Sequence, residues 1–182
     1  PAECAAVKAV APKAELIYTH PVKAQSHIRL ALEDYRIRTL TLDHEDEVAK
    51  ILRIVRGLDL SPEDITLFVR IATRGHAAYE LSKKFGAGPA HAVELAQRVH
   101  NIGFRVGIAF HVGSQVEDTD TYERALASAA WVRARAGVPL AALDIGGGFP
   151  APYGEDPRKA GAKAPDPAEL VREVVGEAEE WG

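Results

Sequence analysis

Short apolar runs alternate along the chain with longer stretches in which apolar residues recur at helical spacing. The apolar runs predict five strands, over residues 16–20, 39–43, 66–72, 106–110 and 140–145. Apolar positions repeated every three or four residues predict helices over residues 3–10, 26–34, 44–57, 90–102, 120–136 and 168–181. The pattern therefore indicates about five strand-then-helix units.

Residue types at the ends of these segments support the assignment. Ser26 is expected to cap the second helix, and the acidic residues 45–47 lie at the start of the third, where the helix dipole favours them. Segments 73–89 and 151–167 lack a clear period and are expected to be loops. Glycines are expected to end the preceding helices at Gly57, Gly103 and Gly137.

Strands that alternate with helices predict a parallel sheet with right-handed crossovers. Two architectures satisfy this alternation, an open doubly wound sheet and a closed (β/α)₈ barrel, and a barrel of about 250 residues would here lack about three strands. The sequence begins at Pro1 and contains no methionine. We therefore expect residues 1–182 to be a single partial domain of a longer chain.

Composition excludes several function classes. The 182 residues are 47% hydrophobic and 26% charged, which is typical of a globular domain. The net charge of -4 and the pI near 6.0 argue against nucleic acid as a partner. Cys4 is the single cysteine, so no intrachain disulfide forms, and neither a membrane span nor a signal peptide is apparent. The cytoplasm is the expected compartment.

The most informative segment is residues 143–150 (LDIGGGFP), an apolar strand that runs into three glycines. Without Cβ atoms, glycines let backbone N–H groups approach an anion closely at the end of a parallel strand. This arrangement favours a ligand that carries a phosphate group. A flexible turn without a ligand is the alternative explanation.

A second strand ends in the same way, because residues 106–110 are followed by His111 and Ser114. The carboxyl ends of parallel strands share one edge of a sheet, so an imidazole, a hydroxyl and the glycines are expected to converge. Arg70 interrupts a third apolar run, and a buried arginine needs an anionic partner. The alternatives are a structural histidine at 111 and a structural ion pair at 70.

These two strand ends, residues 110–115 (FHVGSQ) and 143–150, resemble the paired signatures of the fold-type III, pyridoxal-phosphate-dependent ornithine, lysine and diaminopimelate decarboxylases. The resemblance implies an α/β fold, a partial (β/α)₈ TIM-like barrel of the alanine racemase and decarboxylase type with about five parallel strands. The first strands and the carboxy-terminal β domain are expected to lie outside this sequence. The similarity continues in the family's order at residues 18–23, 42–43, 69–73 and 81–86.

The resemblance also implies the roles of individual residues. Pyridoxal 5′-phosphate is the expected cofactor, with His111 stacked on its ring and Arg70 near the ring. Lys84 matches a family lysine that reaches the second subunit, which implies a homodimer, although a solvated lysine is the alternative. No metal ion is part of this interpretation. The phosphate is expected to be held by Ser114, Gly146, Gly147 and Gly148.

Some family residues have no counterpart here. The family lysine that binds the cofactor covalently lies on the first barrel strand, and Lys23, the nearest candidate, matches a non-catalytic position. The glutamate that pairs with the pyridine nitrogen and the residues of the carboxy-terminal domain are also missing. The segment alone is therefore expected to be inactive.

The sequence thus predicts part of a decarboxylase of a basic amino acid. Ornithine, converted to putrescine in polyamine synthesis, is the first candidate substrate, and lysine or diaminopimelate comes next. Two rival hypotheses stay open. One is a catalytically silent homologue that binds a regulatory protein, and the other is a metal-dependent barrel hydrolase that uses His20, Asp43 and His111.

Overall fold

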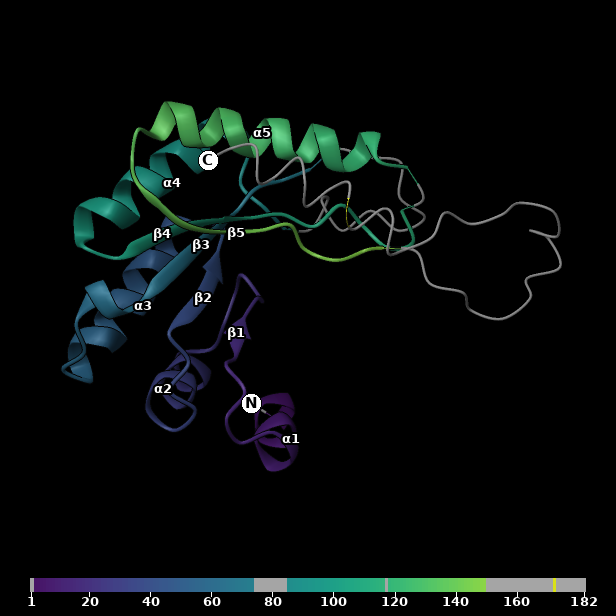
Figure 1. The fold of residues 1–182 in the computed structure, drawn as a ribbon. Coiled ribbons are helices and arrows are strands. Elements are labelled where there is room, and N and C mark those ends of the chain that lie inside the picture. Colours follow the sequence, from purple (N-terminus) through teal and green to yellow (C-terminus); the bar gives the residue numbers. More distant parts are fainter. Residues whose placement is uncertain (1, 74–84, 117, 150–171, 173–182) are drawn as a thin grey trace, which may run out of the picture.

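The computed structural model describes residues 2–73, 85–116, 118–149 and 172. Its helices are α1 (Ala2–Val10), α2 (Gln25–Glu33), α3 (Glu45–Gly57), α4 (Pro89–Ile102) and α5 (Asp120–Ala136), and a short 3₁₀ helix, η1, spans Pro62–Asp64. Its strands are β1 (Ile17–Tyr18), β2 (Thr39–Leu42), β3 (Thr66–Arg70), β4 (Arg105–Ala109) and β5 (Leu140–Asp144). The predicted strand-then-helix alternation is confirmed over this part of the chain (Figure 1).

The five strands form one parallel sheet in which each strand lies beside its neighbour in sequence, in the order β1-β2-β3-β4-β5. A doubly wound sheet reverses its strand order at a switch point, whereas a (β/α)₈ barrel adds strands in one direction. The described strands show no reversal. The sheet is therefore an arc of a barrel, and the doubly wound alternative is excluded for these elements.

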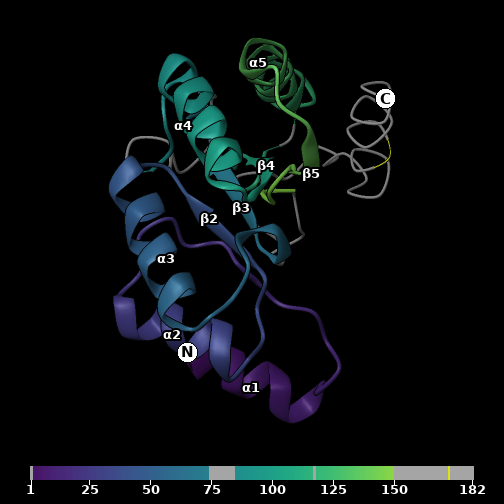
Figure 2. The same cartoon turned by 90° about the vertical axis from the view of Figure 1, so that its left-hand side faces the viewer.

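The two faces of the sheet have different characters because successive side chains on a strand point in opposite directions. One face packs in the hydrophobic core with the helices, and it includes Leu40, Leu67 and Ile108. Figure 2 shows α3, α4 and α5 along this side of the sheet. The alternate positions, among them Thr41 and Arg70, lie on the other face, toward the interior of the barrel. That face positions the candidate site.

The helix boundaries correct one prediction. Ser26 does not cap α2, because the helix begins at Gln25 and Ser26 lies inside it. The carbonyl oxygen of Ala24 accepts the N–H groups of His27 and Ile28, both at 3.0 Å. The N-cap of α2 is therefore Ala24, two residues before the predicted cap. The helix η1 was not predicted. As expected, α3 ends at Gly57, and α4 and α5 end directly before Gly103 and Gly137.

Several predicted features lie outside the residues that the structure describes. These are the helix over 168–181 apart from residue 172, most of the loop at 73–89, Lys84 and the segment 151–167. Among the described residues, no helix combines the length and the apolar character that crossing a membrane requires.

Truncation of Ile108 should test the core. Its side chain on β4 is fully buried in the core, so Ile108→Ala is expected to lower the free energy of unfolding by about 3 kcal/mol through lost contacts and a cavity. Urea denaturation measures this change. The matched control is Val10→Ala at an 85% exposed position, which should leave the unfolding midpoint almost unchanged. An equal effect of both substitutions would contradict the assigned core.

Candidate functional site

A pocket of about 400 Å³ opens at the carboxyl ends of the strands. This volume lies within the range of sites that bind small molecules and cofactors. The pocket takes residues from each of the strand ends, so it depends on the curvature of the whole sheet. It is lined by Thr19, Thr41, Arg70, Ala109, Phe110, His111, Asp144, Gly146 and Gly147.

Arg70, the last residue of β3, supplies a cation to this pocket. Its guanidinium carbon lies 5.6 Å from the centre of the Phe85 ring, so the side chain is held by an aromatic contact. Burial lowers the pKa of Arg70, while Asp43 and Asp144 act in the opposite direction. Within the described part of the chain no carboxylate forms an ion pair with it. The positive charge therefore remains for a ligand.

His111 lies directly after β4, and two hydrogen bonds fix it. Its Nδ1 accepts the backbone N–H of Gly147 at 3.2 Å, and its carbonyl oxygen accepts the hydroxyl of Thr73 at 2.9 Å. Burial and then the charge of Arg70 lower the pKa of the imidazole, against the opposing effect of Asp144. His111 is therefore a neutral ring of fixed orientation at neutral pH.

The glycine segment meets the end of β4 through backbone contacts. Gly146 has a φ of +73° and Gly148 a φ of +103°. A Cβ atom built on Gly146 would overlap the carbonyl oxygen of Phe110, and one built on Gly148 would overlap that of Gly113. Both positions thus require glycine because of conformation and of space. Past β4 and β5 the chain continues as two neighbouring segments (Figure 1).

The structure brings most of the sequence-predicted residues together. Arg70, His111, Gly146 and Gly147 line one pocket. Ser114 and Gly148 are not among the lining residues, and Ser114 is exposed. They adjoin it, because the neighbour of Ser114, Gly113, contacts Gly148 and the carbonyl oxygen of Gly148 accepts the N–H of Val116 at 2.9 Å.

Two of the glycine N–H groups are already engaged within the chain. That of Gly146 donates to Asp144 Oδ1 at 2.8 Å, and that of Gly147 donates to His111. These bonds fix the shape of the segment. A bound anion would therefore have to find its backbone donors at other positions of the two strand ends.

Tyr122, a residue of α5 that contacts the glycine segment, was not predicted from the sequence. Its hydroxyl donates to the carbonyl oxygen of Gly147 at 3.3 Å, and its ring stacks on Phe149 with 5.0 Å between centroids. Burial, with a smaller effect of Asp118, raises the pKa of Tyr122 to about 12, so the hydroxyl keeps its proton. Position 122 carries no sequence signal beyond the apolar face of α5.

Thr41 was also missed, although the alternation of residues 39–42 (TLTL) points to it. In a half-buried strand the leucines face the core and the threonines face the opposite side. Thr41 is 1% exposed, and its Oγ1 is buried without a hydrogen-bond partner. An unsatisfied buried hydroxyl at a pocket wall is an observation that only the structure provides.

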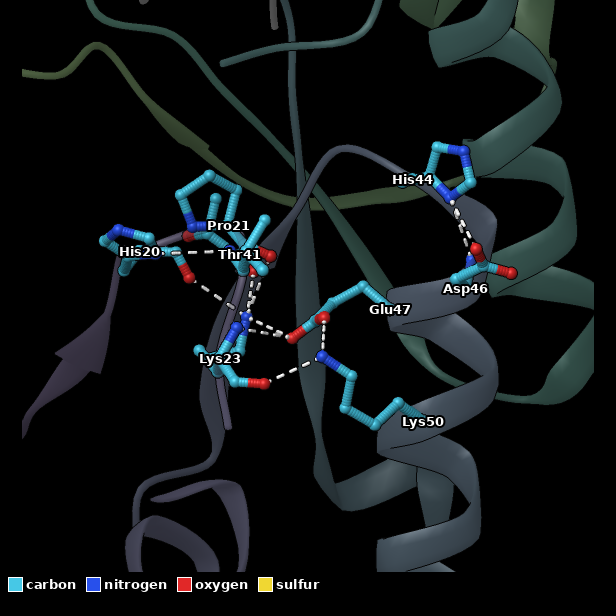
Figure 3. A network of polar contacts seen from close by, with 9 residues as sticks. His20, Pro21, Lys23, Thr41, His44, Asp46, Glu47 and Lys50 are labelled. Atoms are coloured by element: carbon cyan, nitrogen blue, oxygen red, sulfur yellow. Dashed lines mark hydrogen bonds and ion pairs between the residues drawn. The ribbon is translucent and has the colours of Figure 1, made fainter. Parts of the chain in front are cut away.

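A buried ion pair fixes the neighbouring wall (Figure 3). Lys23 is 3% exposed, and its ammonium lies 3.0 Å from Glu47 Oε1. Burial lowers the pKa of Lys23, while Glu47 raises it. The ammonium thus ties the loop after β1 to β2 and α3. It donates to three carbonyl oxygens, those of His20, Pro21 and Thr41.

The geometry gives no support to the hydrolase hypothesis. Asp43 accepts the N–H of Gly86 at 2.8 Å, and His20 packs edge-on against Phe85 with 5.2 Å between centroids. His111 uses its Nδ1 for Gly147. Among residues 2–73, 85–116 and 118–149, no three histidine, cysteine or acidic side chains are placed to hold a metal ion.

The pocket suits an aromatic anion such as pyridoxal 5′-phosphate. A neutral imidazole offers a flat face, the Arg70 cation lacks an ion-pair partner among the described residues, and the Thr41 hydroxyl lacks a hydrogen bond. Each of these groups would gain from a ring that carries oxygen substituents. The residues present therefore fit the cofactor that the sequence resemblance implied.

Comparison with known proteins defines the class. The family described as "Pyridoxal-dependent decarboxylase, pyridoxal binding domain" matches residues 2–180. The chain belongs to this family. The resemblance found in the sequence is thereby confirmed.

Individual relatives agree with this assignment. The lysine/ornithine decarboxylase of Selenomonas ruminantium is 39% identical over 143 residues, which cover 76% of this chain and 34% of that protein. The ornithine decarboxylase of Cricetulus griseus is 35% identical over 144 residues, covering 76% and 30%. Antizyme inhibitor 2 of Xenopus laevis is 35% identical over 146 residues, covering 78% and 30%. The chain spans about a third of the length of these curated relatives.

Solved structures show the same fold. The chain is similar to a crystal structure of a mutant SrLDC in complex with PLP, with a TM-score of 0.74 and 33% identity over 91% of this chain and 41% of that one. It is also similar to a lysine/ornithine decarboxylase from Vibrio vulnificus complexed with putrescine, with a TM-score of 0.66 and 28% identity, covering 88% and 40%. The partial-barrel prediction is confirmed.

The lowered pKa of His111 predicts a specific dependence of stability on pH. The unfolded state binds a proton near the ordinary pKa of 6.5, and the folded state binds it only at lower pH. The free energy of unfolding should therefore fall as pH is lowered from about 7 to about 5. The variant His111→Gln should show a smaller fall in denaturation curves at each pH. Identical slopes for both proteins would contradict the assigned environment.

Removal of the buried ammonium should be costly. Lys23→Met leaves three carbonyl oxygens without their donor, so we expect a loss of about 3 kcal/mol in the free energy of unfolding. Urea denaturation measures it. Lys50→Met is the matched control, because Lys50 also pairs with Glu47 but is 22% exposed. A loss at position 50 equal to that at position 23 would refute the central place of Lys23.

Proposed function

We propose that this chain is the pyridoxal-phosphate-binding barrel portion of a decarboxylase that acts on a basic amino acid. Ornithine is the first candidate substrate and lysine the second, with diaminopimelate after them. The observation that carries the proposal is the pocket that joins His111, Arg70 and the glycine segment, in a chain that belongs to the pyridoxal-dependent decarboxylase family. Named relatives include decarboxylases of lysine and ornithine.

The proposed chemistry divides between cofactor and protein. Pyridoxal 5′-phosphate, when bound, withdraws the electron pair that remains when CO₂ leaves the substrate. His111 stacks on the ring, orients it and excludes water from one face. Its neutral state matters, because Nδ1 must keep its lone pair for the Gly147 N–H. Arg70 supplies a positive charge near the ring.

The phosphate is proposed to lie at the outer end of the pocket. Ser114 offers a hydroxyl, and Gly148 offers a backbone that no side chain obstructs. Gly146 and Gly147 shape this end of the site, since their N–H groups donate to Asp144 and His111. Gly146 and Gly147 would then contribute to phosphate binding by setting the shape of the backbone and not by donating hydrogen bonds to the phosphate.

One relative supports a second candidate function. Antizyme inhibitor 2 matches this chain as well as several decarboxylases do, and its name describes inhibition rather than catalysis. A catalytically silent homologue that binds a regulatory protein is the corresponding alternative. The two candidates differ in whether CO₂ is released.

Three further features belong to the proposal. Residues 1–182 form one partial cofactor-binding domain. The protein acts in the cytoplasm on a small amino-acid substrate, without nucleic acid or membrane as a partner. It forms a homodimer, with the segment around Lys84 as a contact. Sedimentation of the purified complete protein tests the last point.

The decisive assay is release of ¹⁴CO₂ from carboxyl-labelled ornithine or lysine by the complete protein with pyridoxal 5′-phosphate. We expect release from at least one of the two. His111→Asn should lower the rate about a hundredfold through loss of ring positioning. His44→Asn is the matched control, because His44 is exposed outside the pocket. Cofactor binding without CO₂ release would favour the regulatory homologue.

A further inference from the structure

We propose that Thr41 contacts the ligand of the pocket, with its hydroxyl hydrogen-bonded to a negatively charged oxygen of the bound molecule. The inference rests on the proposed function and adds to it a residue that the sequence signatures do not include. Thr41 belongs to β2, so β2 would contribute a ligand contact to the pocket.

The first observation is an unmet hydrogen bond. Thr41 is 1% exposed, lines the pocket, and holds an Oγ1 with no hydrogen-bond partner. Buried polar groups in folded proteins are almost always paired, because an unpaired one loses its hydration without compensation. A ligand oxygen in the pocket would complete the missing bond.

The second observation is that the position of the hydroxyl is fixed. Thr41 pairs in register with Phe68 of β3, and its carbonyl oxygen accepts from the ammonium of Lys23. Both flanking leucines are fully buried in the core. A β-branched side chain on such a strand has little rotational freedom. The fixed backbone and the restricted side chain together hold Oγ1 at the pocket wall.

The third observation concerns charge. Arg70, on the adjacent strand β3, lines the same pocket and has no ion-pair partner among the described residues. A cation and a hydroxyl on neighbouring strands together favour an oxygen that carries negative charge, since the hydroxyl donates to it and the guanidinium neutralises it. The phenolic oxygen of the pyridoxal ring and a substrate carboxylate both have this chemistry.

The test compares Thr41→Val, which replaces the hydroxyl by a methyl group of the same shape, with Thr41→Ser, which keeps the hydroxyl. The probe is pyridoxamine 5′-phosphate, which retains the phenolic oxygen and forms no covalent bond with a protein lysine. Binding to the complete protein is followed by calorimetry. We expect about tenfold weaker binding for Thr41→Val and a change within about twofold for Thr41→Ser.

Thermal unfolding without ligand separates binding from a structural role. Because the valine removes an unsatisfied hydroxyl, its unfolding temperature should equal or exceed that of the wild type. Unchanged binding of both the probe and ornithine by Thr41→Val would overturn the inference. Equal weakening of probe binding by both variants, or weaker binding together with a lower unfolding temperature, would also overturn it. Failure of the wild type to bind the probe would instead overturn the proposed function, and the inference with it. Unchanged probe affinity combined with weaker binding of ornithine would locate the contact on the substrate carboxylate and support the proposal.

Discussion

The site depends on the close approach of two backbone segments, one after β4 and one after β5. At Gly146 and Gly148 the chain passes so near the carbonyl oxygens of Phe110 and Gly113 that no side chain fits between them. This contact places the Gly147 N–H beside the ring of His111, and the hydrogen bond between them sets the orientation of the imidazole. A local steric requirement thus determines the position of a group that the proposed chemistry needs.

Electrostatics acts on the same ring. Arg70 and burial both disfavour the protonated imidazole, and Asp144 alone opposes them. The carboxylate of Asp144 also accepts the Gly146 N–H, which binds it to the glycine segment. The pocket therefore combines a neutral aromatic ring with a cation. The two acids that act on Arg70, Asp144 and Asp43, each accept a backbone N–H group, from Gly146 and Gly86. Such a balance favours an anionic aromatic ligand over a cationic one.

Much of this arrangement was predictable because it is encoded locally. Glycines after α4 and α5 mark where the helices end, and an arginine within an apolar strand indicates a polar surface at the strand end. The capping role of Ser26 failed because the first turn of α2 closes through the Ala24 carbonyl oxygen. The proposed role of Thr41 was not predicted from the sequence. A missing hydrogen bond depends on the folded surroundings of a residue, which its neighbours in sequence do not determine.

Two buried polar groups in this fold differ in a way that separates structure from function. Lys23 meets a carboxylate and three carbonyl oxygens, so its burial is compensated within the chain. Thr41, whose backbone that same lysine holds, is left with an uncompensated hydroxyl. A polar group satisfied by the protein alone explains stability, whereas one held rigidly and left unsatisfied implies a partner from outside. The contacts of Lys23 thus give the loop after β1 its shape, whereas the unsatisfied hydroxyl of Thr41 is the basis of the ligand contact proposed for it.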